Sequence, residues 1–88
     1  MFTSWGRETA VKFTSGLLRT MLEQLSDEER FGAVLRAKGI VDGGESWLHF
    51  DYVPGEISVR EGSPGVTGRL CVIGSQLKEE ALARLFGV

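Results

Sequence analysis

The segment WLHFDYVPGEISVR, residues 47–60, constrains the fold more than any other part of the chain. Two runs in which apolar and polar residues alternate flank the pair Pro54–Gly55, and this pattern predicts a β-hairpin with a two-residue turn. The turn sets the register, because it places His49 opposite Arg60. We therefore expect one face of the hairpin to be apolar and the other to be polar.

This register divides the side chains of the predicted sheet into two sets. From the hairpin, the set expected under the helices is Leu48, Phe50, Tyr52, Ile57 and Val59, and the opposite set is Trp47, His49, Asp51, Ser58 and Arg60. From the neighbouring strands, we expect Leu35, Ala37, Gly39, Leu70 and Val72 to point inward, and Arg36, Lys38, Arg69 and Cys71 to point outward. The outward set is rich in cations and contains one tryptophan.

Helical periodicity appears at two places in the chain. Residues 8–25 carry apolar side chains at intervals of four and predict a first helix. The charged connector SDEER, residues 26–30, fits a capping box formed by Ser26 and Glu29. A closing helix is predicted from Ser75 onward, with Glu79 and Glu80 near its positive end.

Three further segments read as strands, and they complete the predicted architecture. These are residues 2–5, 34–41 and 66–74. The order of elements predicts an α+β two-layer sandwich, with an antiparallel sheet of four to five strands and two helices on one face, of ferredoxin-like character. We expect residues 1–88 to form a single domain. The core predicted from this arrangement is Phe13, Leu17, Phe50, Tyr52, Leu70, Val72, Leu82 and Leu85.

Composition and charge argue against several functional classes for this chain. The formal net charge is −2, which gives no general attraction to nucleic acid or anionic membranes. No apolar run reaches the roughly 18 residues of a membrane span, and the first residues lack the pattern of a signal peptide. A single cysteine, Cys71, excludes an internal disulfide. We therefore expect a cytoplasmic protein without a membrane partner.

The sequence offers few residues for catalysis, and we expect no enzyme. It contains neither a GxxxxGK[ST] phosphate loop nor a GxGxxG segment, so a nucleotide site within these residues is not expected. His49 and Cys71 are the only histidine and cysteine. They are weak candidates for metal ligands, because a closed zinc site needs about four ligands. The commoner interpretations are a surface histidine and a small apolar residue within a strand.

Three segments of the chain carry a resemblance to a known family. LRAKG (35–39), FDYVPGE (50–56) and the run from RLCVIG to LF (69–86) resemble the C-terminal domain of the CobW family of GTP-binding metallochaperones. Members of this family typically join such a domain to an N-terminal GTPase domain with a phosphate loop and a Cys-x-Cys-Cys metal motif. Both are missing from these 88 residues. In the family, an aliphatic or aromatic residue usually stands where Cys71 stands, which favours a packing role for this thiol.

The resemblance implies an indirect function for this chain. It implies GTP and zinc or cobalt for the full-length family only, with no cofactor in this chain. The partners that it implies are a CobW-type GTPase domain in cis or in trans, a client metalloenzyme in metal delivery or cobalamin biosynthesis, and a second copy of the chain. We expect an accessory domain that acts by protein–protein contact through the outward sheet face. The candidate contacts are Trp47, His49, Arg36, Lys38, Arg60 and Arg69.

Other interpretations of the outward face stay open. Exposed cations commonly serve solubility, and Trp47 near a strand start could fold over the sheet edge. The domain could bind metal itself through His49 with Asp51 or Cys71. Open sheets with exposed aromatic and basic residues also bind single-stranded RNA. Only Trp47 offers a stacking ring on this face, so nucleic acid is the weaker alternative.

Overall fold

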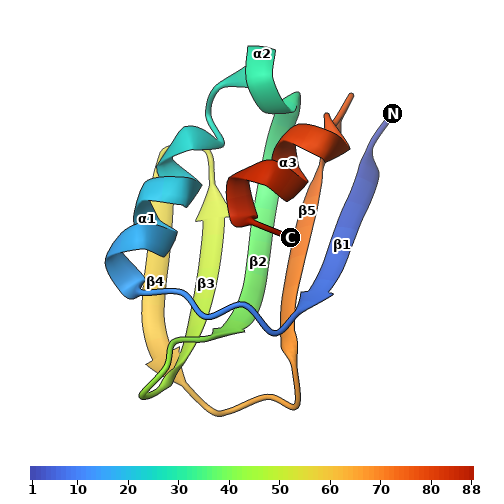
Figure 1. Cartoon of the computed structure of the whole chain (residues 1–88). Helices are drawn as coiled ribbons and strands as arrows, with labels where there is room; N and C mark the ends of the chain where they lie inside the picture. Colours follow the sequence, from blue (N-terminus) through green and yellow to red (C-terminus); the bar gives the residue numbers. More distant parts are fainter.

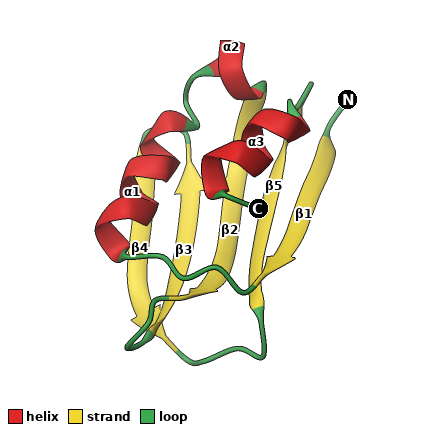
Figure 2. Cartoon of the chain, viewed as in Figure 1, coloured by secondary structure: helices red, strands yellow, loops and turns green.

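A five-stranded antiparallel sheet forms one layer of the computed structural model, which describes all 88 residues, and three helices form the other (Figures 1 and 2). The strands are β1 (Thr3–Thr9), β2 (Ala33–Asp42), β3 (Trp47–Val53), β4 (Glu56–Gly62) and β5 (Gly68–Ser75). The helices are α1 (Ser15–Gln24), the single-turn α2 (Glu28–Phe31) and α3 (Glu79–Phe86). The predicted α+β two-layer sandwich is thus confirmed, with one short helix more than expected.

The order of strands in the sheet is β1-β5-β2-β3-β4, so β1 and β4 are its edges. All three helices lie on the same side, with α1 in front of β3 and β4 and α3 nearer β2 and β5 (Figure 1). A cluster of 16 buried apolar residues fills the space between the two layers. The opposite side of the sheet carries no covering element, and we call it the outer face.

The central hairpin has the register that the sequence predicts. Val53 lies opposite Glu56, and His49 lies opposite Arg60. Gly55 has a φ angle of 85°, as the second central residue of a type II turn after proline requires. Exposure alternates along β3, where every second residue from Leu48 to Tyr52 is buried and the residues between them are partly exposed. The division into an apolar and a polar face is therefore confirmed for this strand.

Phe50 occupies the middle of the core and rests on a glycine of the next strand. It lies opposite Gly39 in β2 and is 2% exposed. A Cβ atom added at Gly39 would lie 2.6 Å from the ring of Phe50 and 2.2 Å from the carbonyl oxygen of Arg69. Only a glycine leaves the space that the phenyl ring and the β5 backbone occupy here.

The first helix is shorter than its periodicity predicts. Residues 3–9 pair with β5 along their whole length as β1, so the helix cannot begin at Glu8. It begins after Thr14, whose hydroxyl accepts a hydrogen bond from the backbone N–H of Leu17 at 3.1 Å and so caps the helix. Leu17 itself is 51% exposed, and its predicted place in the core is wrong. The buried stripe runs through Leu18 and Leu22, about 100° around the helix from Leu17.

A β-bulge changes the alternation at the start of β2. The register with β5 shifts between Val34 and Arg36, which adds one residue to this strand. Val34 and Ala37 are buried, whereas Leu35 between them is 41% exposed. The predicted inward orientation of Leu35 is therefore wrong, because strict alternation does not hold across a bulge.

The segments around α2 and α3 also differ from the prediction. Asp27, not Ser26, caps α2, since its carboxylate accepts from the N–H of Arg30 at 3.3 Å. The closing helix begins at Glu79, because β5 continues to Ser75. Lys78 then joins the two helices: its N–H donates to the carbonyl oxygen of Phe31 at 3.0 Å, and its ammonium donates to the carbonyl oxygen of Glu29. The acidic first turn predicted for this helix is present.

Candidate functional site

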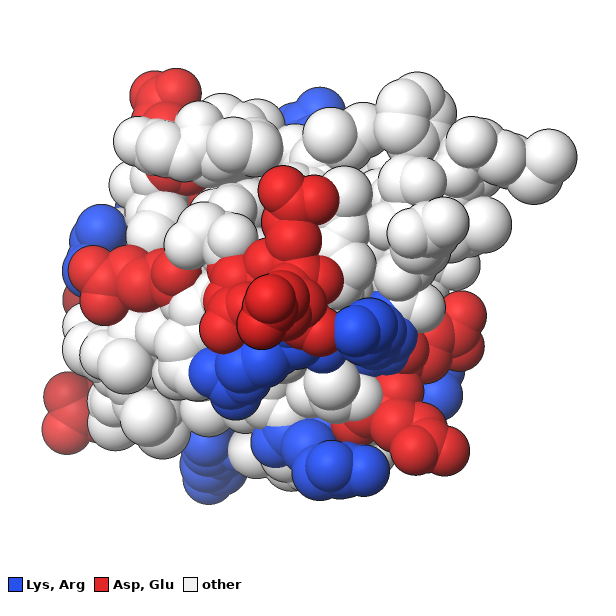
Figure 3. Space-filling model, turned by 90° about the horizontal axis from the view of Figure 1, so that it is seen from above, with Lys and Arg blue, Asp and Glu red and all other residues white.

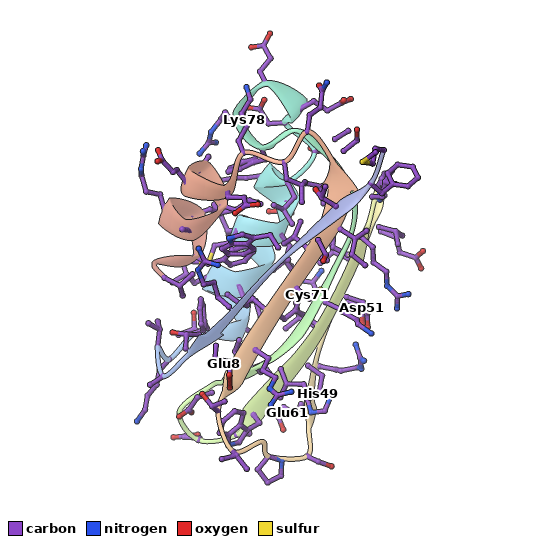
Figure 4. The ribbon with its side chains drawn as sticks, turned by 90° about the vertical axis from the view of Figure 1, so that its right-hand side faces the viewer. Glu8, His49, Asp51, Glu61, Cys71 and Lys78 are labelled. Carbon is purple, nitrogen blue, oxygen red and sulfur yellow. The ribbon has the colours of Figure 1, made fainter.

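The outer face brings together side chains from all five strands. Figure 4 shows His49, Asp51 and Cys71 on the side of the sheet away from the helices. Strand register arranges the outward residues in two neighbouring rows that cross the sheet. One row is Glu8, Arg69, Ile40, His49 and Arg60, and the other is Gly6, Cys71, Lys38, Asp51 and Ser58.

Asp51 is the central acid of this face and holds two arginines. Its Oδ1 lies 3.2 Å from Nη2 of Arg36, and its Oδ2 lies 3.3 Å from Nη2 of Arg60. Arg60 also donates to the hydroxyl oxygen of Ser58 at 3.2 Å. Burial alone would raise the pKa of Asp51, but the hydrogen bonds and charges of the two arginines outweigh it and lower the pKa below its ordinary value. Asp51 is therefore ionised at neutral pH and orients both guanidinium groups.

His49 is held by the connection between β4 and β5. Its Nε2 lies 2.9 Å from the carbonyl oxygen of Ser63. Because a carbonyl oxygen only accepts, this contact requires a proton on Nε2. The ring rests on Gly62, where an added Cβ would lie 2.6 Å from it. In this position, Nε2 is committed to a backbone contact and is not free to bind a metal ion.

Trp47 lies on the outer face and is partly covered there. It is half-buried. An added Cβ at Gly65, in the connection after β4, would lie 3.6 Å from its ring and 3.8 Å from Cγ2 of Ile40. The sequence left open whether Trp47 faces outward or packs at the end of the sheet. In the structure it does both, because it faces outward and packs under the loop that follows β4.

An open depression of about 340 Å³ lies between the two rows of outward residues. It is lined by Lys38, Gly39, Ile40, His49, Phe50, Asp51, Arg60, Arg69 and Cys71. Three of its charged residues are basic and one is acidic. The depression thus contains four of the six predicted contact residues. Arg36 borders it through its ion pair with Asp51, and Trp47 lies in the neighbouring region beside Ile40.

The two candidate metal ligands share this depression without forming a metal centre. His49 and Cys71 both line it, next to Asp51. However, no group of three or more histidine, cysteine, aspartate or glutamate side chains is arranged to hold a metal ion. The arrangement offers cations and hydrogen-bond donors at an accessible surface, which suits binding of an anionic partner more than coordination chemistry. None of the helices is long and apolar enough to span a membrane.

Comparison with known families identifies the domain. Residues 2–88 match the family described as the cobalamin synthesis protein cobW C-terminal domain. The chain belongs to this family. The resemblance carried by LRAKG, FDYVPGE and the segment from RLCVIG to LF is thereby confirmed. No curated protein matches the chain significantly.

Two solved structures are similar to this CobW C-terminal domain over nearly its whole length. The zinc-bound YjiA GTPase from E. coli has 25% identity and a TM-score of 0.77. A zinc-bound triple mutant of the YjiA GTPase has 26% identity and a TM-score of 0.76. In both cases, 98% of this chain is covered, but only 29% of the similar chain. The CobW C-terminal domain described here therefore corresponds to less than a third of those GTPases.

Proposed function

We propose that this CobW C-terminal domain is an accessory, protein-binding part of a GTP-dependent metal-delivery system. Its partner is a CobW-type GTPase domain, in the same chain or a separate one, or a client metalloenzyme. The observation that carries this proposal is the uncovered outer face, where cations ordered by ion pairs surround an open depression in a domain of a GTPase family. In this scheme, the domain contributes contacts and no catalysis of its own.

The similar YjiA structures support the division of labour. They are described as zinc-bound GTPases, and they extend well beyond the region that matches this chain. These 88 residues contain no phosphate loop that could cradle a nucleotide. We therefore assign GTP hydrolysis and metal binding to the part of such proteins that lies outside this domain.

The ordering of the outward side chains favours a binding role for this face. Arg36 and Arg60 are both 53% exposed, yet each is held by the same carboxylate. Holding a long side chain in one orientation before binding lowers the entropy lost when a partner arrives. Arginine and tryptophan are also the residue types that most often anchor protein interfaces. Trp47 and the arginines of the outer face provide both types.

The test compares one variant of each layer. Trp47→Ala removes an aromatic anchor from the outer face, and Leu17→Ala removes an exposed apolar side chain from the helical layer as the matched control. We expect Trp47→Ala to lower the stability of the domain by only about 1 kcal/mol, because the ring is half-buried. We also expect this variant to weaken binding to a separately expressed CobW-type GTPase domain by about tenfold, or about 1.4 kcal/mol.

Isothermal titration calorimetry well below the melting temperature separates binding from stability. Binding that is unchanged in Trp47→Ala and reduced in Leu17→Ala would place the interface on the helical layer. That result would overturn the proposed role of the outer face.

A further inference from the structure

We propose that the depression on the outer face binds an acidic segment of a partner protein, with Lys38, Arg60 and Arg69 as the cations that receive its carboxylates. The inference rests on the proposed function and adds the chemistry of the partner. It depends on which cations of this face already have a carboxylate partner and on the spacing of these cations across the strands. It also depends on the lack of the aromatic rings and buried donors that nucleic acid or free phosphate would need.

Lys38 is the cation without a carboxylate. It lies directly opposite Asp51 in the neighbouring strand. The two carboxylate oxygens of Asp51, however, already form ion pairs with Nη2 of Arg36 at 3.2 Å and Nη2 of Arg60 at 3.3 Å. No acidic side chain lies within ion-pair distance of the ammonium of Lys38. An incoming carboxylate would give this ammonium its first partner.

Arg69 is only loosely neutralised. Its Nε lies 3.9 Å from an oxygen of Glu8, and the two side chains are 75% and 65% exposed. A pair at this distance and exposure contributes little free energy. Arg69 can therefore turn toward a new carboxylate at low cost. Of the four charged residues in the depression, three are basic, although the whole chain has a net charge of −2.

The spacing of the outward row predicts a sequence pattern for the segment. Arg69 in β5 and Arg60 in β4 are separated by Ile40 and His49, so three strand intervals of about 4.8 Å lie between them, roughly 14 Å in all. An extended peptide covers about 13–14 Å between residues i and i+4. A segment of the form acidic–x–apolar–x–acidic would thus place one carboxylate at Arg69 and the other at Arg60, with its apolar side chain between Ile40 and His49. Arg60 keeps free donors for this contact because it shares Asp51 with Arg36. Lys38, in the neighbouring row, adds a third cation to the depression.

Other anions fit this face less well. A single-stranded nucleic acid needs stacking surfaces and a strong positive field. Of the aromatic residues in the five strands, Trp5, Phe50 and Tyr52 are buried in the core, and only Trp47 faces outward, partly covered by the loop at Gly65. The pI of the chain is about 5.3. Seen from the α2 end, the surface mixes acidic and basic side chains (Figure 3). The depression also contains no buried polar side chain that could donate hydrogen bonds to a free phosphate away from water.

The test uses two labelled synthetic peptides and two double variants of the full 88-residue chain. One peptide carries the pattern Glu-x-Leu-x-Glu, and the other has glutamine in place of both glutamates. Lys38→Glu with Arg69→Glu reverses two charges in the depression. Arg19→Glu with Arg84→Glu makes the same change of net charge on exposed positions of α1 and α3. Circular dichroism melting curves check that both variants fold.

Fluorescence anisotropy should show binding of the glutamate peptide to the parent chain, and at least about tenfold weaker binding of the glutamine peptide. The outer-face variant should lose about tenfold or more in affinity, whereas the helix-layer variant should lose less than about threefold. Added salt should weaken the interaction. Equal losses in both variants would mean attraction to net charge only and would overturn the inference. Tighter binding of an oligonucleotide, or self-association through the acidic α2 of a second copy, would also overturn it.

Titrations with the GTPase domain distinguish failure of this inference from failure of the proposed function. If binding of that domain is weakened by Trp47→Ala but unchanged by reversal of Lys38 and Arg69, the outer face binds a partner that is not acidic, and only the present inference fails. If binding is unchanged by all of these substitutions, the proposed function fails as well.

Discussion

Replacing Phe50 with alanine tests the assignment of the hairpin to the core. The ring is 2% exposed and lies over Gly39 in the space between sheet and helices. Truncation of a buried phenylalanine removes its transfer free energy and leaves a cavity, which together cost about 3–5 kcal/mol. Because glycine already stands below the ring, no side chain from β2 can fill the cavity. We expect a loss at the upper end of this range.

The size of this loss relative to the total stability determines the assay. A domain of 88 residues is stable by about 4–13 kcal/mol, at about 0.05–0.15 kcal/mol per residue. Urea unfolding followed by tryptophan fluorescence, to which Trp5 (2% exposed in the core) and the half-buried Trp47 contribute, should therefore show a large shift of the midpoint or an unfolded variant. Val53→Ala is the control, since this side chain belongs to the same strand and is 38% exposed. We expect it to change stability by no more than about 0.5 kcal/mol. A loss below about 1 kcal/mol for Phe50→Ala would refute the placement of this face in the core.

Three further predictions concern titration and nucleotide binding. The lowered pKa of Asp51 means that its ion pairs stabilise the fold above the unfolded-state pKa of about 3.9 and that this contribution is lost as pH falls through the folded-state pKa. In Asp51→Asn, the free energy of unfolding should therefore decrease less as pH falls than it does in the parent chain. The difference should be below about 1 kcal/mol, because the carboxylate is more than a third exposed. The same pH dependence in both proteins would contradict the ion-pair geometry. Burial raises the pKa of Tyr52, so stability should fall as pH rises above about 10, and Tyr52→Phe should remove this decline in urea midpoints measured on both sides of that pH. Finally, the chain should show no heat of GTP binding in calorimetry, since no segment of it forms a phosphate loop, and micromolar affinity would contradict the assignment of nucleotide chemistry to another domain.

The structure also identifies a core residue that sequence patterns did not indicate. Trp5 is buried and stacks on Phe86, with the ring centroids 6.3 Å apart, and the guanidinium of Arg7 lies 5.1 Å from its ring. Residues 2–5 predict only a short strand, whereas β1 continues to Thr9. The length of this strand depends on its pairing with β5, from Thr3 with Gly74 to Thr9 with Gly68, and no local pattern encodes pairing over such a separation.

The central hairpin can be predicted from residues 47–60 alone, because the information that specifies it is local. Alternation over a few residues and a proline–glycine turn set which residues face each other, and the predicted pairing of His49 with Arg60 agrees with the structure. The same reasoning predicted the polar character of the outer face, and the family resemblance rests on short segments whose residues are adjacent in the sequence. These features need no knowledge of distant segments.

Features that depend on residues far apart in the sequence are visible in the folded domain and not in any local pattern. The bulge that exposes Leu35 arises where β2 pairs with β5, and helix α1 begins late because β1 is held by that same strand. The contact of His49 with Ser63 and the sharing of Asp51 between two arginines join residues from different elements. Periodicity predicts the face on which a side chain lies, but the neighbours that neutralise, cover or orient it are set by contacts that form only when the whole sheet assembles.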